Sequence, residues 1–265
     1  MTNDSVSREQ PALLFRVGIE RTPDARTPLE IRPYPGTCRH GVLQAAVLAS
    51  ATDVAGSLYS REGGVVERAF TTDLSVRVPP VLAPAVIRTS GSILSATRTI
   101  VTSELRFEVD GVAIGCGQTT FKRVLAPEGS PLPSPPLPER LNGIQISGSL
   151  DAELGIEVLD AARGELLLDA AASIRTPNGA LQGTAVAVLV EASAVAASEA
   201  LAGAARVACE LDIRYLAGGR HGPIRTQAFR IARSPDLLRV ELRDRGDGDA
   251  LTAAALVRCE APPRQ

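Results

Sequence analysis

The chain repeats itself once, and this repeat constrains its fold more than any other feature of the sequence. A shift of 137 or 138 residues aligns the two halves of the 265-residue chain. The matching segments are Gly18-Ile19-Glu20 with Gly155-Ile156-Glu157, Gly41 with Gly179, Ile87-Arg88-Thr89 with Ile224-Arg225-Thr226, Glu104-Leu105-Arg106 with Glu241-Leu242-Arg243, and Asp110-Gly111 with Asp247-Gly248. A nearly constant offset over about a hundred residues indicates two copies of one structural unit.

A proline-rich segment separates the two copies. It contains Pro127, Pro131, Pro133, Pro135, Pro136 and Pro138. Proline removes backbone donors and favours an extended, semi-rigid chain over packed structure. We therefore expect a first domain over residues 1–124, a linker over 125–140 and a second domain over 141–265.

Each copy has one long segment rich in alanine, valine and leucine. These segments cover residues 41–60 and 179–202. Their composition and their length beyond a typical strand predict helices. Apolar residues such as Val47 and Val54, or Leu189 and Val195, occur on every side of these helices. Both helices are therefore expected to be buried all round.

The other apolar segments predict β-strands. In the first copy they cover 65–78, 85–96, 98–109 and 112–124, after an extended stretch at 13–21; the second copy opens with extended stretches at 154–159 and 165–174. Asp110-Gly111 suits a type I′ hairpin turn because it supplies positive φ angles, and Asp247-Gly248 is expected at the equivalent turn. One buried helix and several antiparallel strands in each copy predict an α+β protein in which a curved sheet wraps around each helix.

Composition limits the functional classes that the chain could serve. A formal net charge of −2 gives no general attraction to nucleic acid. The polar first residues lack the apolar core of a signal peptide, and no run of about 18 apolar residues predicts a membrane span. Four cysteines without CxxC spacing, Cys38, Cys116, Cys209 and Cys259, predict free thiols in a reduced cytoplasm. With only His40 and His221, neither a zinc site nor a hydrolase triad is expected, and no cofactor is implied.

Asp53 and Glu191 are the exceptional residues of the two apolar helices. The offset of 138 that aligns Gly41 with Gly179 also aligns these two acids, which stand too far into the helices to be N-caps. A carboxylate in apolar surroundings must be paired, hydrogen-bonded or shifted toward its neutral form. A solvent-facing side of the helix would explain one such acid, but recurrence in both copies favours a functional role.

The residues around these acids resemble a known family. Gly41-Val42-Leu43-Gln44-Ala45 followed by Asp53, and Asn178-Gly179-Ala180-Leu181-Gln182-Gly183 followed by Glu191, resemble hotdog-fold acyl-CoA thioesterases of the phenylacetic-acid-degradation (PaaI-like) group. That family carries a His-Gly-Gly turn at the helix start and a catalytic Asp or Glu nine residues after the histidine. Here glutamine stands at both histidine positions, and only the second copy keeps the first glycine. Thr71 is similar to the family's hydroxyl residue that supports the acid from the next strand.

The spacing within each copy implies that the sites form between copies. Nine residues at about 100° each place Gln182 and Glu191 on opposite sides of their helix, so they cannot share one site. The resemblance implies that each acid meets the helix start of the other copy. Site one would combine Asp53 and Thr71 with Asn178, Gln182 and Gly183; site two would combine Glu191 with Gln44, Ala45 and His40. Copy two has Ala208 or Cys209 at the position of Thr71, so site one is closer to the family pattern.

The resemblance implies hydrolysis of the thioester of an acyl-CoA or an acyl carrier protein. The N–H of Gly183 would stabilise the oxyanion, Thr71 would hold the acid or the water, and Asp53 would act as general base or as nucleophile. The tandem copies could work as a monomeric pseudo-dimer or assemble further. A non-catalytic acyl-binding module is an alternative because both histidines are replaced. A hotdog dehydratase is another, since His40 precedes Gly41, but Ala46 and Thr184 stand where that family needs an acid.

Overall fold

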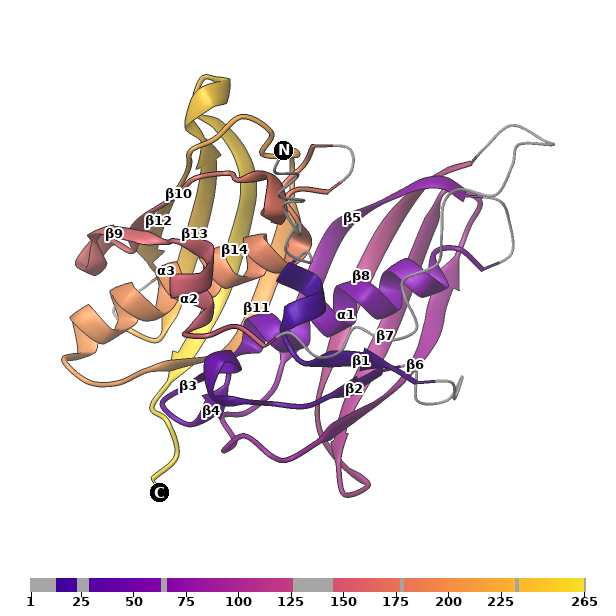
Figure 1. Ribbon diagram of the computed structural model, residues 1–265, viewed down its shortest axis with the longest axis horizontal. Helices are drawn as coiled ribbons and strands as arrows, with labels where there is room; N and C mark the ends of the chain where they lie inside the picture. The colour runs from indigo at the N-terminus through magenta and orange to yellow at the C-terminus, as the bar shows by residue number, and fades with distance from the viewer. Residues whose placement is uncertain are drawn as a thin grey trace, which may run out of the picture.

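The computed structural model describes residues 13–22, 29–62, 66–125, 145–176, 179–231 and 234–264. Two long helices, α1 (Ala45–Tyr59) and α3 (Gly183–Ala202), lie against one strongly curved twelve-stranded sheet (Figure 1). Each half of the sheet curves around the helix of its own copy. This is the α+β architecture of two tandem hotdog domains that the sequence predicts, and it is confirmed.

All the pairings in the large sheet are antiparallel, and both copies contribute six strands to it. The first copy supplies β1 (Ile19–Arg21), β2 (Leu29–Ile31), β5 (Val66–Arg77), β6 (Ile87–Ala96), β7 (Ile100–Val109) and β8 (Val112–Leu125). The second supplies β9 (Glu157–Asp160), β10 (Glu165–Leu168), β11 (Val207–Tyr215), β12 (Ile224–Arg230), β13 (Leu237–Asp244) and β14 (Ala250–Glu260). The short strands β3 (Cys38–Arg39) and β4 (Val42–Leu43) pair with each other, and the short helix α2 (Leu150–Leu154) opens the second copy.

The strand order is symmetric about the junction between the copies. It runs β1-β2-β6-β7-β8-β5-β11-β14-β13-β12-β10-β9, so each strand of one copy has its counterpart at the same distance from the centre. At the centre, Ser75 of β5 pairs with Asp212 of β11, and these two residues are 137 positions apart. The register therefore places a pseudo-twofold axis at this pair and gives the offset 137 for the flanking strands.

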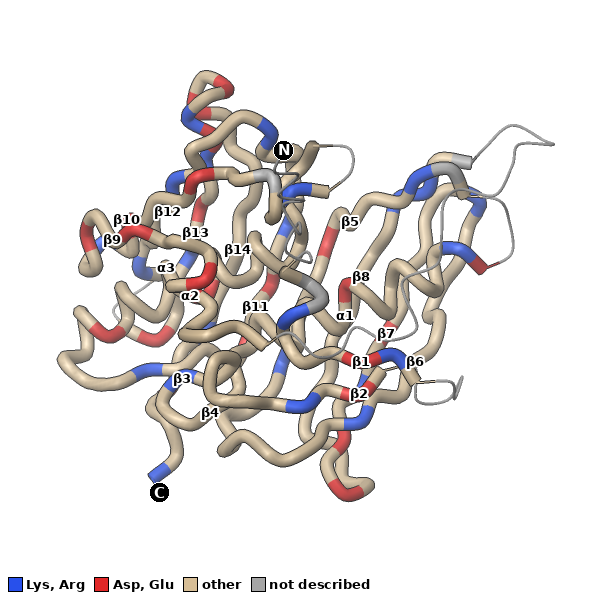
Figure 2. The backbone as a smooth tube through the Cα atoms, viewed as in Figure 1, with Lys and Arg blue, Asp and Glu red and all other residues tan. Residues whose placement is uncertain are grey.

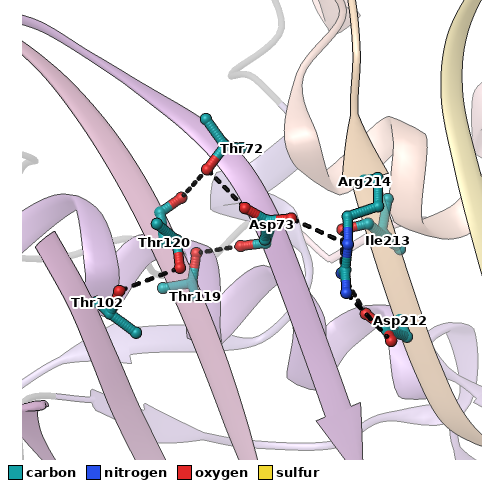
Figure 3. A network of polar contacts seen from close by, with 8 residues as sticks. All are labelled: Thr72, Asp73, Thr102, Thr119, Thr120, Asp212, Ile213 and Arg214. Carbon is teal, nitrogen blue, oxygen red and sulfur yellow. Dashed lines mark hydrogen bonds and ion pairs between the residues drawn. The ribbon is translucent and has the colours of Figure 1, made fainter. Parts of the chain in front are cut away.

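Two ion pairs follow the same symmetry across the β5–β11 junction. Arg214 Nε lies 3.0 Å from Asp73 Oδ1, and Arg77 Nε lies 3.8 Å from Glu210 Oε2 (Figure 3 shows the first pair). All four side chains are exposed, so these pairs contribute little to stability. Charges of both signs are spread over the strands and loops without one dominant patch (Figure 2). The junction is held mainly by the backbone ladder and by buried side chains such as Leu74 and Ile213.

The core consists of the two helices and the inner face of the sheet. Helix α1 packs on β5, β7 and β8, helix α3 packs on the strands of the second copy, and the helices also contact each other. Helix α3 is long and apolar enough to cross a membrane, but 72% of its most apolar stretch is buried inside the protein, as expected of a core helix.

Some predicted boundaries and turns differ from the structure. The helices begin at Ala45 and Gly183 rather than at 41 and 179, because the preceding residues pair in short extended segments. Residues 13–16 form a 3-10 turn, and the strand predicted over 165–174 ends at Leu168. All four cysteines are free thiols, as predicted. Most of the linker lies outside the described residues, so the boundaries at 124 and 141 stay a prediction.

The hairpin turns of the two copies are not alike. Asp110 and Gly111 have φ angles of 50° and 79° between the paired residues Val109 and Val112, which confirms the two-residue turn. The equivalent turn predicted at Asp247-Gly248 is wrong. There β13 ends at Asp244, whose carboxylate accepts the N–H of Gly246 and starts a 3-10 turn, and the loop spans residues 245–249.

Candidate functional site

A bulge in strand β5 directs Thr71 toward helix α1. The pairing of β5 with β8 shifts register between Thr71 and Asp73, so Thr72 is an extra residue. Leu74 and Val76 are buried on the helix side of the sheet, and without the bulge Thr72 would share their face. Instead Thr72 donates hydrogen bonds to Asp73 Oδ2 and to the Thr120 carbonyl on the other face (Figure 3), and Thr71 faces the helix.

Thr71 holds one oxygen of the Asp53 carboxylate. Its Oγ1 donates a 2.6 Å hydrogen bond to Asp53 Oδ1. Burial in the middle of α1 raises the pKa of Asp53 to about 6, and the hydrogen bond from Thr71 opposes that rise. A carboxyl group with this pKa is mostly ionised at neutral pH. Its pKa is also close enough to neutral pH for the carboxylate to accept a proton during the reaction, as a general base must.

The second oxygen of Asp53 faces the start of helix α3. A Cβ built on Gly183 would lie 2.6 Å from Asp53 Oδ2, so only glycine allows this approach. Gly183 is the first residue of α3, and Gln182 is its N-cap without a side-chain capping bond. Within the described part of the chain, the Gly183 N–H has no hydrogen-bond acceptor. The positive end of the α3 dipole and a free backbone donor thus lie beside the acid of the other copy.

Tyr215 also reaches this site, although the family resemblance does not point to it. It is the last residue of β11, and its Oη lies 3.7 Å from the same Cβ position on Gly183. The Asp53 charge adds to the effect of burial, which raises the pKa of Tyr215 well above its usual value. The repeat could have pointed to Tyr215, because the offset of 137 aligns it with the apolar Val78. The second copy thus has a hydroxyl where the first copy has none.

Site two has a carboxylate but a closed geometry. Glu191 is 1% exposed, and it accepts the N–H of Ala46 at 2.6 Å and that of Ala45 at 3.3 Å. Burial raises the pKa of Glu191 to about 7; the Ala46 N–H and the charge of Arg39 oppose the rise. Arg39 in turn forms an ion pair with Asp151. The carboxylate therefore occupies the backbone donors at the start of α1, the groups that an oxyanion would need.

The space beside site two is small and apolar. A cavity of about 10 Å³ lies next to Ala45 and is bordered by Val78, Ala208 and other apolar residues at the start of α1 and the end of β5. Strand β11 has its own register shift, between Ala208 and Glu210, so Cys209 is the counterpart of Thr72. The counterpart of Thr71 is therefore Ala208, and site two lacks the supporting hydroxyl.

The two glutamines that precede the helices, Gln44 and Gln182, are buried, and neither Oε1 has a described hydrogen-bond partner. The Gln182 amide donates to the carbonyls of Ser173 (3.2 Å) and Arg175 (3.0 Å), so it holds the preceding loop. Gln44 precedes α1 as its N-cap.

His40 lies away from Glu191. Its Nε2 is 2.8 Å from Oε1 of Glu199, two turns further along α3 and partly exposed at the surface, so the structure does not bring it into site two. Asn178, predicted for site one, lies outside the described residues. The described residues contain no group of His, Cys, Asp or Glu that could hold a metal ion.

Comparison with known proteins finds similar folds among solved structures. No family model matches the chain, and no curated protein sequence does. A provisionally named thioesterase from Novosphingobium aromaticivorans is 16% identical, with a TM-score of 0.62 over 93% of this chain and 99% of the other. A protein of unknown function with a hotdog fold from Alicyclobacillus acidocaldarius is 11% identical (TM-score 0.60; 96% and 100%). An acyl-CoA thioesterase II from Mycobacterium marinum is 14% identical (TM-score 0.53; 95% and 99%). At these identities the likeness shows the fold: the chain is built as a double hotdog.

Proposed function

We propose that the chain hydrolyses acyl thioesters, of coenzyme A or of an acyl carrier protein, at site one. The observation that carries this proposal is the environment of one carboxylate: Asp53 is held by Thr71 on one oxygen and faces the start of α3, at Gly183, with the other. The combination supplies a base, a group that orients it and a donor for a developing oxyanion within one small region. Several similar solved structures carry thioesterase names, which supports the same reaction class.

In the proposed reaction, Asp53 activates water. The water oxygen bonds to the thioester carbonyl carbon while its proton passes to the Asp53 carboxylate. The electron pair of the carbonyl moves to its oxygen, which the N–H of Gly183 and the α3 dipole stabilise. Collapse of this intermediate breaks the carbon–sulfur bond, and Asp53 returns the proton to the leaving thiolate. The products are a carboxylic acid and a free thiol, so the step balances without a cofactor.

Glu191 has a structural role in this proposal. Both of its oxygens accept N–H groups from the first turn of α1, so it stabilises that helix N-terminus. Among the described residues no hydroxyl supports it, because Ala208 stands at the position of the threonine. The chain would thus have one active site, formed from both copies, and a single chain would complete it. We infer from the sequence resemblance that the chain is related to the phenylacetic-acid-degradation-like thioesterases, with glutamine in place of their histidine.

Release of free thiol from a panel of acyl-CoA thioesters tests this function. The panel covers short, medium, long and aryl acyl groups, with an acyl-carrier-protein thioester as a further substrate. Turnover of at least one of these substrates is expected. Binding of an acyl-CoA, measured by calorimetry, without thiol release from any panel member would instead support a non-catalytic acyl-binding module. An independent single-turnover reaction in ¹⁸O-labelled water probes the route: a general base puts the label only in the product acid, whereas label found in Asp53 would identify an anhydride that water opens at the Asp53 carbonyl.

A further inference from the structure

Tyr215 is the polar group of site one that the proposed mechanism does not use. Its Oη and Asp53 Oδ2 both approach the same face of Gly183, at 3.7 Å and 2.6 Å from the Cβ position. No described hydrogen bond joins the phenol to the carboxylate. The hydroxyl therefore lies at the start of α3 on the side of the base, where a substrate carbonyl would have to sit to be attacked.

The Tyr215 hydroxyl is a buried polar group without a described hydrogen bond. Its oxygen is buried and has no hydrogen-bond partner among the described residues. Leaving a buried hydroxyl unpaired destabilises the folded protein, so such groups are uncommon unless a ligand or a water pairs with them. Since burial and the nearby Asp53 raise its pKa, the phenol stays protonated and can donate a hydrogen bond to a ligand.

The repeat shows that this tyrosine is not required by the architecture. The pseudo-twofold axis relates Tyr215 to Val78, which continues from β5 and donates its backbone N–H to the Cys209 carbonyl. Val78 borders the apolar cavity of site two. Site one thus has two hydroxyls, from Thr71 and Tyr215, where site two has Ala208 and Val78. An apolar residue fits this position of the fold, so the phenol is a property of site one alone.

We propose that Tyr215 is a further catalytic residue, whose hydroxyl donates a hydrogen bond to the carbonyl oxygen of the bound thioester. This inference rests on the proposed hydrolysis at Asp53. As water attacks, negative charge develops on that oxygen, and two donors from the second copy, the phenol and the Gly183 N–H, meet it. The proton of Tyr215 stays on the phenol throughout.

The test is Tyr215→Phe, with Tyr59→Phe as matched control. The Tyr59 hydroxyl is also buried without a described partner, but it lies beside Gly91 of β6, away from Asp53. Steady-state thiol release, its pH profile and urea unfolding are measured for wild type, both variants and Asp53→Asn on one substrate. For Tyr215→Phe we expect kcat to fall about 100-fold, with KM and the pH profile nearly unchanged. Its urea midpoint should stay equal to or above that of wild type, since the lost hydroxyl has no hydrogen-bond partner among the described residues.

The other outcomes of this experiment would overturn the role of Tyr215 or the proposed function. Full activity in Tyr215→Phe beside an inactive Asp53→Asn would overturn the role of Tyr215 and leave the proposed function intact. A shifted acidic limb of the pH profile would show that the phenol acts on Asp53 rather than on the substrate, which also overturns the inference. An equal loss of kcat in Tyr59→Phe would show that removal of any buried phenol hydroxyl lowers activity, which would also overturn the role of Tyr215. Absence of thiol release by wild type would reject the proposed function itself.

Discussion

Asp53 of α1 lies against Gly183, the first residue of α3, closely enough that a Cβ on the glycine would meet Oδ2 at 2.6 Å. This contact joins the two copies at the point where a carboxylate and a helix N-terminus can act on one substrate. It depends on the pseudo-twofold axis at Ser75 and Asp212, which brings the middle of one helix to the start of the other. The site therefore belongs to neither copy alone.

Replacement of Gly183 by alanine is expected to displace the Asp53 carboxylate. The added methyl group must push Oδ2 away, because the other oxygen is held by Thr71. We expect kcat for thiol release to fall at least about 10-fold, since catalysis depends on sub-ångström placement of the base. The free energy of unfolding should change little, because alanine favours helix.

Gly148→Ala is the matched control for that change. A Cβ there would meet nothing closer than 3.8 Å, so wild-type kcat is expected. Retained activity in Gly183→Ala would show that the close approach of acid and helix start has no catalytic meaning.

Thr71→Val should make Asp53 a weaker acid. The threonine hydroxyl lowers the pKa of Asp53 by its hydrogen bond, so its removal raises that pKa further above about 6. A bond to a charged group is worth about 1.5–3 kcal/mol, which corresponds to a shift of roughly one unit or more. The acidic limb of the rate profile should move to higher pH by that amount, and Thr71→Ser should restore it. A profile unmoved in Thr71→Val would contradict the supporting role of the hydroxyl.

The pH dependence of the wild-type protein follows from the ionisation of Asp53. A general base acts only as the carboxylate, and burial raises its pKa to about 6. We expect kcat/KM to fall tenfold per unit as pH drops below about 6 and to reach a plateau above neutrality. Rates measured from pH 4.5 to 8.5 test this. A flat profile over that range would exclude a titrating base with this pKa.

Glu191 should affect stability rather than turnover. Its pKa is raised from 4.5 to about 7 in the folded protein, so the folded state holds the proton more tightly than the unfolded state. The corresponding stability is present below pH 4.5 and is lost as pH rises through about 7. Relative to Glu191→Gln, the wild type should lose roughly 2 kcal/mol of unfolding free energy between pH 5.5 and 8.5, at about 1.4 kcal/mol per unit.

Urea unfolding of both proteins at the two pH values measures this difference. If the two stabilities keep a constant difference, Glu191 does not titrate as a buried group. A loss of kcat in Glu191→Gln without loss of fold would instead restore site two as a catalytic site.

The repeat in the sequence was sufficient to predict the double architecture. A constant offset predicts two equivalent helices and a symmetric sheet, and the apolar composition of both helices predicts that they lie inside it. The pairing of Asp53 with Thr71 followed from the family resemblance. The bulge that makes it geometrically possible could not be read from the sequence, since Thr71, Thr72 and Asp73 offer no glycine or proline that would mark it.

Contacts between the copies were harder to predict. Whether Glu191 meets an open cleft or the bonded N-terminus of α1 depends on how closely the two helices pack, which the sequence does not specify. The position of Tyr215 depends on how far β11 extends past the central Ser75–Asp212 pair, which only the strand register determines. His40 was expected beside Glu191 from its place in the chain. Instead, His40 lies in the turn of the β3–β4 hairpin, which places it beside Glu199 at the surface.

The most direct test of the account compares Asp53→Asn with Glu191→Gln on the best thioester substrate. Each change keeps the size of the side chain and removes one carboxylate, so the comparison tests which of the two helix acids performs the chemistry. If Asp53 is the base, kcat falls about 100- to 10,000-fold in Asp53→Asn and stays within a few-fold of wild type in Glu191→Gln. Full thiol release by folded Asp53→Asn would contradict it.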